Sequence, residues 1–106
     1  MPPTEPIPPE SSITYLANRL ERIRNKHWLI LYSEPIFLAT QPPQEIDDRF
    51  VEAHTAFLNY RAQIKSRCDT PAFENPFTPL WDRINSLIAQ LANQRAQYQV
   101  AIAQND

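Results

Sequence analysis

The chain has 106 residues, a net charge of −2, one cysteine, no glycine and 11 prolines. This length fits one domain, and the weak, interspersed charge gives no electrostatic footprint for nucleic acid or an anionic membrane. The lone Cys68 excludes an internal disulfide and a multi-cysteine zinc site, and it favours a reducing, cytoplasmic compartment. Without glycine, phosphate-binding glycine loops are excluded and tight hairpin turns lose their preferred residue, so long helices joined by proline-containing connectors are favoured.

Residues 1–10 contain five prolines. We expect this segment to be a disordered, proline-rich arm that leans toward the polyproline II conformation. It has neither the cationic nor the apolar part of a secretory signal. It could act as a ligand for an aromatic groove or as a solubilising tail, and the folded domain is expected over residues 11–106.

The first helix is expected to begin at a capping serine, Ser11 or Ser12. It should end near Ser33, because Pro35 disfavours the helical conformation of Glu34. Spacings of three and four alternate along its apolar positions, which is typical of a helix with the heptad character of a coiled coil. These positions are Ile13, Leu16, Leu20, Ile23, His27 and Ile30.

The stretch "HWLILYSEPIFLAT", residues 27–40, is too apolar for a helix that buries one face. It is interrupted and much shorter than the ~20 residues of a membrane span. A hairpin of "WLILY" and "IFLAT" is an alternative, although a lone two-stranded hairpin is marginally stable. On a helix, Trp28 lies on the flank of the core face and Leu29 points almost directly away from it. Either residues 36–38 fold back over this surface or another chain covers it.

We therefore predict a partner-binding patch at this end of the domain. Trp and Tyr are the residue types that dominate interface energetics. The predicted function is a non-catalytic protein–protein interaction module, such as a small helical adaptor, assembly factor or regulator. Its partner would be another protein or a second copy of this chain, with no membrane involved. The predicted patch consists of Trp28, Leu29, Tyr32, Ile36 and Phe37.

The second helix is expected to begin at Pro43, since proline suits the first turn of a helix. Acidic residues near this end and basic residues near Arg67 complement the helix dipole. "CDTP" should end the helix. Its apolar stripe consists of Ile46, Phe50, Ala53, Phe57, Tyr60 and Ile64.

The third helix is expected to begin at Thr78 and Pro79, after a loop whose Phe73 and Phe77 should pack onto the other helices. Three helices of similar length predict an all-α, up-down-up antiparallel three-helix bundle. The apolar stripe of the third helix consists of Leu80, Ile84, Leu87, Ile88, Leu91, Tyr98 and Ile102.

Three residues are candidates for metal binding or catalysis. His27, His54 and Cys68 lie on one side of the first two helices and could form a metal cluster, but no His-x-x-x-His or Cys-x-x-Cys pair supports it. A core histidine and a small buried thiol are the plainer interpretations. Because no nucleophile, acid and base converge in the sequence, we expect no enzyme activity, no metal and no cofactor.

Cations provide two further hypotheses. Arg95 falls inside the third stripe, so it is either exposed where the bundle thins or part of an ion pair between helices or between chains. A second group of cations lies in the first helix, where a solvated face is the plain interpretation. The alternative function is a nucleic-acid-associated regulator that uses this basic face, although nucleic acid is not the expected partner. The face consists of Arg19, Arg22, Arg24 and Lys26.

Overall fold

The computed structural model describes residues 12–69 and 75–104. These residues form five helices and contain no strand, which confirms the all-α class and shows that the hairpin over residues 28–40 is wrong. The expected arm over residues 1–10 and Phe73 lie outside the described residues. The helices are α1 (Ile13–Lys26), α2 (Trp28–Tyr32), α3 (Pro35–Leu38), α4 (Pro43–Cys68) and α5 (Thr78–Gln104).

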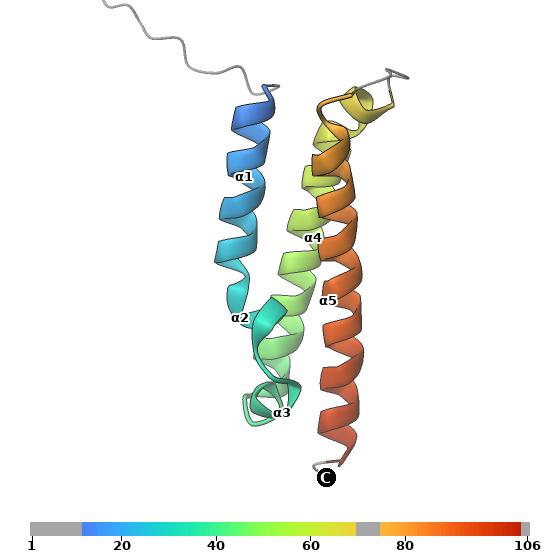
Figure 1. The fold of residues 1–106 in the computed structure, drawn as a ribbon. Coiled ribbons are helices and arrows are strands. Elements are labelled where there is room, and N and C mark those ends of the chain that lie inside the picture. The colour runs from blue at the N-terminus through green and yellow to red at the C-terminus, as the bar shows by residue number, and fades with distance from the viewer. Residues whose placement is uncertain (1–11, 70–74, 105–106) are drawn as a thin grey trace, which may run out of the picture.

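The three long helices lie side by side. In Figure 1, α1 runs downward, α4 returns upward and α5 runs downward again. Helix α3 lies toward the end where α4 begins, α2 lies beside the middle of α5, and both short helices pack against α5. Helix α4 packs against α5 along its length and also contacts α1. The short helices therefore continue the path of α1 along α5 toward the start of α4.

The first expected helix is interrupted at His27. Helix α1 begins as predicted, because Ser12 Oγ accepts a hydrogen bond from the Tyr15 amide at 3.0 Å. It ends at Lys26, and His27 leaves helical geometry with φ −107° and ψ 25° before α2 begins. The buried ring of His27 meets the Phe57 ring edge-on, with 6.2 Å between the centroids. The interruption thus coincides with an imidazole placed in the core.

Prolines set the connection from α2 to α4. Ser33 and Glu34 are extended, with ψ 152° and 139°, as the residue before a proline prefers. Pro35 is then the first residue of α3, and Pro43 is the first residue of α4, as predicted. No residue of the described ranges has a positive φ, so the chain reverses here without the left-handed conformation that glycine favours.

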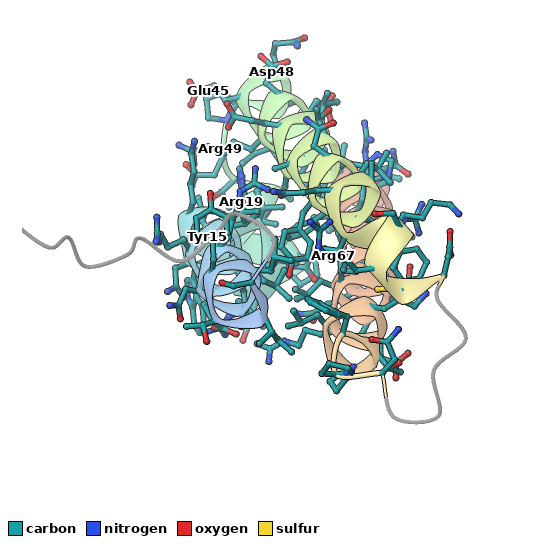
Figure 2. The ribbon with its side chains drawn as sticks, turned by 90° about the horizontal axis from the view of Figure 1, so that it is seen from above. Tyr15, Arg19, Glu45, Asp48, Arg49 and Arg67 are labelled. Carbon is teal, nitrogen blue, oxygen red and sulfur yellow. The ribbon has the colours of Figure 1, made fainter. Side chains whose placement is uncertain are left out.

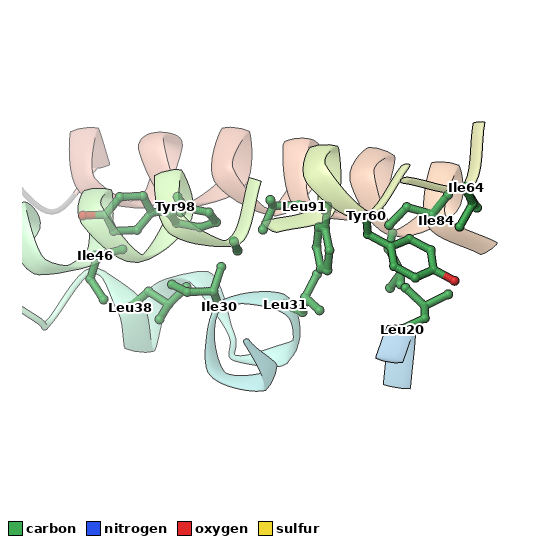
Figure 3. Packing of buried hydrophobic residues seen from close by; sticks show 14 of the residues in the cluster. Leu20, Ile30, Leu31, Leu38, Ile46, Tyr60, Ile64, Ile84, Leu91 and Tyr98 are labelled. Carbon is green, nitrogen blue, oxygen red and sulfur yellow. The ribbon is translucent and has the colours of Figure 1, made fainter. Parts of the chain in front are cut away.

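The core follows the predicted stripes closely in α4. All six predicted positions of this helix are at most 2% exposed. The stripe of α5 is buried at four of its seven positions, while the other three pack against the core and are partly buried. Figure 3 shows side chains from all five helices meeting in one cluster. The buried hydrophobic residues outside α4 are Leu16, Leu20, Ile30, Leu31, Leu38, Ile84, Leu87, Leu91 and Tyr98.

Polar side chains connect the helices at three backbone carbonyls. The buried Tyr60 hydroxyl donates to the Leu16 carbonyl of α1 at 2.8 Å, and Figure 3 shows this ring reaching toward α1. At the end of α2, the Gln90 amide donates to the Leu31 carbonyl at 3.4 Å, and the Gln94 amide donates to the Ser33 carbonyl. Because Pro35 has no N–H, Leu31 lacks the donor that a continuing helix would supply. Helix α5 therefore supplies donors to the end of α2.

Candidate functional site

Four of the five side chains in the predicted patch are on the surface. Trp28 is 53% exposed, Ile36 is 70% exposed and Phe37 is 47% exposed, and Tyr32 is also exposed. They belong to α2 and α3, which follow one another along the chain after α1 (Figure 1). Helix α3 places Leu38 in the core but leaves Ile36 and Phe37 outside. The fold-back of residues 36–38 therefore leaves a large apolar surface uncovered.

Leu29 differs from the other four. It is partly buried and packs against the core cluster, whereas an unbroken helix would have pointed it away from the core. The physical reason is the interruption at His27, which changes the rotation of α2 relative to α1. The accessible part of the patch is therefore Trp28, Tyr32, Ile36 and Phe37.

Trp28 and Tyr32 form an exposed aromatic pair. They are one helical turn apart, with ring centroids 4.2 Å apart and an interplanar angle of 40°. The Arg24 guanidinium lies 5.7 Å from the centroid of the Trp28 ring, a cation–π arrangement. Arg24 is also 3.0 Å from the Glu21 carboxylate, which Arg83 of α5 contacts at 2.8 Å. This charged group borders the aromatic pair and orients the Trp28 ring.

A groove extends the apolar surface from α3 onto α5. Its floor and walls include Pro35 and Ile36 of α3 and Val100 and Ala101 of α5. Val100 is 56% exposed. Sequence reasoning missed Val100, because it lies outside the core stripe of its helix. The available signal was a large aliphatic residue on a helix face otherwise made of Gln, Asn and Ala.

The candidate chemical residues do not come together. His27 is in the core, where burial lowers the pKa of its imidazole, while His54 is exposed on α4. The Cys68 thiol donates to the Phe77 carbonyl at 3.7 Å, and burial raises the pKa of this thiol. Across residues 12–69 and 75–104, no group of three or more His, Cys, Asp and Glu side chains could hold a metal ion.

The basic face of α1 is divided between internal and exposed cations. Arg19 donates to Gln63 and lies 6.0 Å from the centroid of the Tyr60 ring, and Figure 2 shows it beside α4. Arg24 is engaged by Glu21 and Trp28, as described above. Arg22 and Lys26 are exposed. Contact of this face with nucleic acid stays a prediction.

Arg95 lies between full exposure and burial, and an ion pair with another chain stays a prediction. Its guanidinium lies 5.8 Å from the centroid of the Phe50 ring, and the side chain is partly buried. Its Nε atom is buried without a hydrogen-bond partner, and none of the ion pairs among the described residues includes it. Arg95 is therefore a cation whose donors the described residues leave unused.

No model of a known protein family, no characterised protein and no solved structure matches the chain. Among the helices that the structure describes, none combines the length and the apolar character needed to cross a membrane.

Proposed function

We propose that this chain is a non-catalytic, cytoplasmic protein-interaction module. It binds another protein, or a second copy of itself, through the patch of Trp28, Leu29, Tyr32, Ile36 and Phe37. The observation that carries the proposal is the exposure of four large apolar side chains on the two consecutive short helices α2 and α3. Single exposed apolar residues are normal on a protein surface, whereas a group of them is typical of an interaction site.

The proposed scaffold is an up-down-up three-helix bundle. Its first rod consists of α1, α2 and α3 in succession, and α4 and α5 are the other two. The alternating directions of α1, α4 and α5 in Figure 1 support this arrangement. In such a bundle the patch belongs to the end of the first rod, where the groove beside Val100 enlarges the apolar surface.

The composition of the patch also supports protein binding. Burying one large apolar side chain contributes about 1.5–3 kcal/mol, and aromatic residues are common among the residues that dominate interface energies. The Trp28–Tyr32 pair is held by its own ring contact and by Arg24. A pair that is already ordered loses less side-chain entropy when a partner covers it.

The test compares Ile36→Glu with Val51→Glu. Both residues are exposed aliphatic side chains, but Val51 lies on α4 and outside the patch. Light scattering after size-exclusion chromatography should show a dimer that Ile36→Glu dissociates and Val51→Glu retains. If the wild-type chain is monomeric, a photo-crosslinking residue at position 37 should capture a protein partner in cells, and Ile36→Glu should abolish the capture.

Both variants should melt within a few degrees of the wild-type chain, because neither position is in the core. Leu29→Glu is unsuitable as a test, since Leu29 packs against the core and a charge there would unfold the chain. Unfolding by Ile36→Glu, or a monomer that yields no crosslinked partner, would contradict the proposed function.

A further inference from the structure

A small cleft lies between α4 and α5, separate from the proposed interaction patch. Its volume is about 210 Å³. Phe50, Leu91, Ala92 and Ala96 give it apolar walls, and His54, Arg95 and Gln99 give it polar ones. Phe50 and Leu91 belong to the core, so the cleft opens onto the core where α4 and α5 meet.

The polar groups of this cleft have one dominant charge. Arg95 carries a permanent positive charge, Gln99 is an amide, and no Asp or Glu lines the cleft. The apolar ring of Phe50 lies against the guanidinium, with 5.8 Å from its centroid to the guanidinium carbon. The cleft therefore combines an uncompensated cation with an apolar floor.

The cation also lacks hydrogen bonds. A guanidinium has five N–H donors, and the Nε–H of Arg95 is buried with no acceptor among the described residues. Burial hides this Nε–H from solvent, so a bound molecule does not reach it. The two terminal nitrogens of the guanidinium make no hydrogen bond to the described residues and are not buried, so they are the donors available to an anion in the cleft.

We propose that this cleft binds a small free carboxylate that carries a compact apolar body. The carboxylate would accept hydrogen bonds from Arg95, because the two planar groups match in a paired geometry. The apolar body would contact Phe50, Leu91 and the methyl groups of Ala92 and Ala96, where small side chains leave room for it. Gln99 and His54 lie at the polar walls and would contact the carboxylate end.

Benzoate is a suitable probe, because it joins one carboxylate to one flat apolar ring. Titrated into the full chain, it should shift the NMR amide signals of Ala92, Ala96 and His54 in a saturable manner. The expected Kd is on the order of 1–10 mM, as for other ligands of this size. Benzamide, which lacks the charge, and acetate, which lacks the ring, should each bind at least about tenfold more weakly.

Two variants test separately the positive charge of Arg95 and the open volume of the cleft. Arg95→Gln should weaken benzoate binding at least about tenfold, whereas Arg49→Gln removes a charge from an exposed position of α4 outside the cleft and should leave binding unchanged. Ala96→Leu should fill the cleft and abolish binding while retaining Arg95. Ala96 is exposed, so this variant should fold even if Arg95→Gln does not.

The proposal is wrong if benzoate gives no saturable shift at about tenfold above the expected Kd. It is also wrong if benzamide binds as tightly as benzoate, or if Ala96→Leu binds like the wild-type chain. Shifts confined to the exposed cations Arg22 and Lys26 would indicate nonspecific ion binding and would likewise overturn it. These outcomes are independent of the light-scattering test of the patch, because the two sites share no residue.

Discussion

Replacing Tyr60 by Phe removes one atom from the contact between α4 and α1. The Tyr60 hydroxyl is buried and donates to the Leu16 carbonyl at 2.8 Å. Leu16 lies inside α1, so its carbonyl keeps a helical donor after the substitution. No acceptor is left unpaired, and the loss is the net value of one buried hydrogen bond. Near pH 8, we expect Tyr60→Phe to lower the free energy of unfolding by about 1 kcal/mol.

The same hydroxyl makes the stability depend on pH. Burial raises the pKa of Tyr60 to about 12, although the nearby Arg19 opposes the shift. The corresponding pKa in the unfolded chain is about 10, so the unfolded chain loses this proton first as the pH rises. Stability contributed by the neutral hydroxyl is therefore complete below about pH 10 and is lost by about pH 12. Halfway, at about pH 11, the wild-type chain has lost about 1.4 kcal/mol through this group alone.

Tyr60→Phe cannot undergo this loss, so its deficit should disappear at about pH 11. The measurement is urea unfolding followed by circular dichroism, for both chains at both pH values. Tyr98→Phe is the matched control at the lower pH. Tyr98 is equally buried, but its hydroxyl has no hydrogen-bond partner within the described residues, so its removal should be neutral or slightly stabilising. Equal losses in the two variants near pH 8, or an unchanged Tyr60→Phe deficit at about pH 11, would refute the reasoning.

Substitutions at three further positions test other contacts. Ser12→Ala removes the acceptor of the Tyr15 amide and should cost about 1 kcal/mol in urea unfolding, while Ser12→Asp should cost less. Burial lowers the pKa of His27, so the unfolded chain takes up this proton first as the pH falls below about 6.5. The urea midpoint should then fall less with acid in His27→Leu than in the wild-type chain. Gln94→Leu removes the donor of the Ser33 carbonyl and should cost about 1 kcal/mol, with faster hydrogen exchange in α2.

The long helices could be predicted from the sequence because their signals are local. Pro43 and the acidic residues after it mark the start of α4, and apolar spacing alone identifies its six buried positions. Thr78 and Pro79 mark the start of α5 in the same way. In both helices the spacing of the apolar residues and the residues at the helix start indicate the same helix. Tertiary contacts therefore do not override the local sequence preference.

The division of the first helix could not be predicted, because it depends on contacts distant in the sequence. The segment from Ile13 to Tyr32 has a continuous helical pattern, and nothing local marks His27 as a break. The ring of His27 meets Phe57, thirty residues further along the chain. The roles of Gln90 and Gln94 in α5 also depend on distant contacts. In the sequence they resemble solvent-facing residues, whereas in the structure they donate hydrogen bonds to carbonyls at the end of α2.

The exposure of the patch residues could be predicted in part, whereas the binding of a partner stays a prediction. An excess of apolar residues over one helical face indicated a second buried or binding surface, and Trp28 and Ile36 are exposed accordingly. Leu29 differs because its direction was derived from an unbroken helix. The cleft of Arg95 was beyond sequence reasoning, since it requires the packing of Phe50 against a residue of another helix.

The glutamine contacts between α5 and α2 determine at which stage of synthesis α2 can reach its final structure. Helices α2 and α3 have five and four residues, too short to persist without neighbours. Among the described helices, α5 leaves the ribosome last, and until then the Leu31 and Ser33 carbonyls lack the donors it brings. Helix α2, with its exposed Trp28 and Tyr32, therefore acquires its final position only after α5 has been synthesised and has docked. A partner that binds these two side chains would distinguish finished chains from nascent ones.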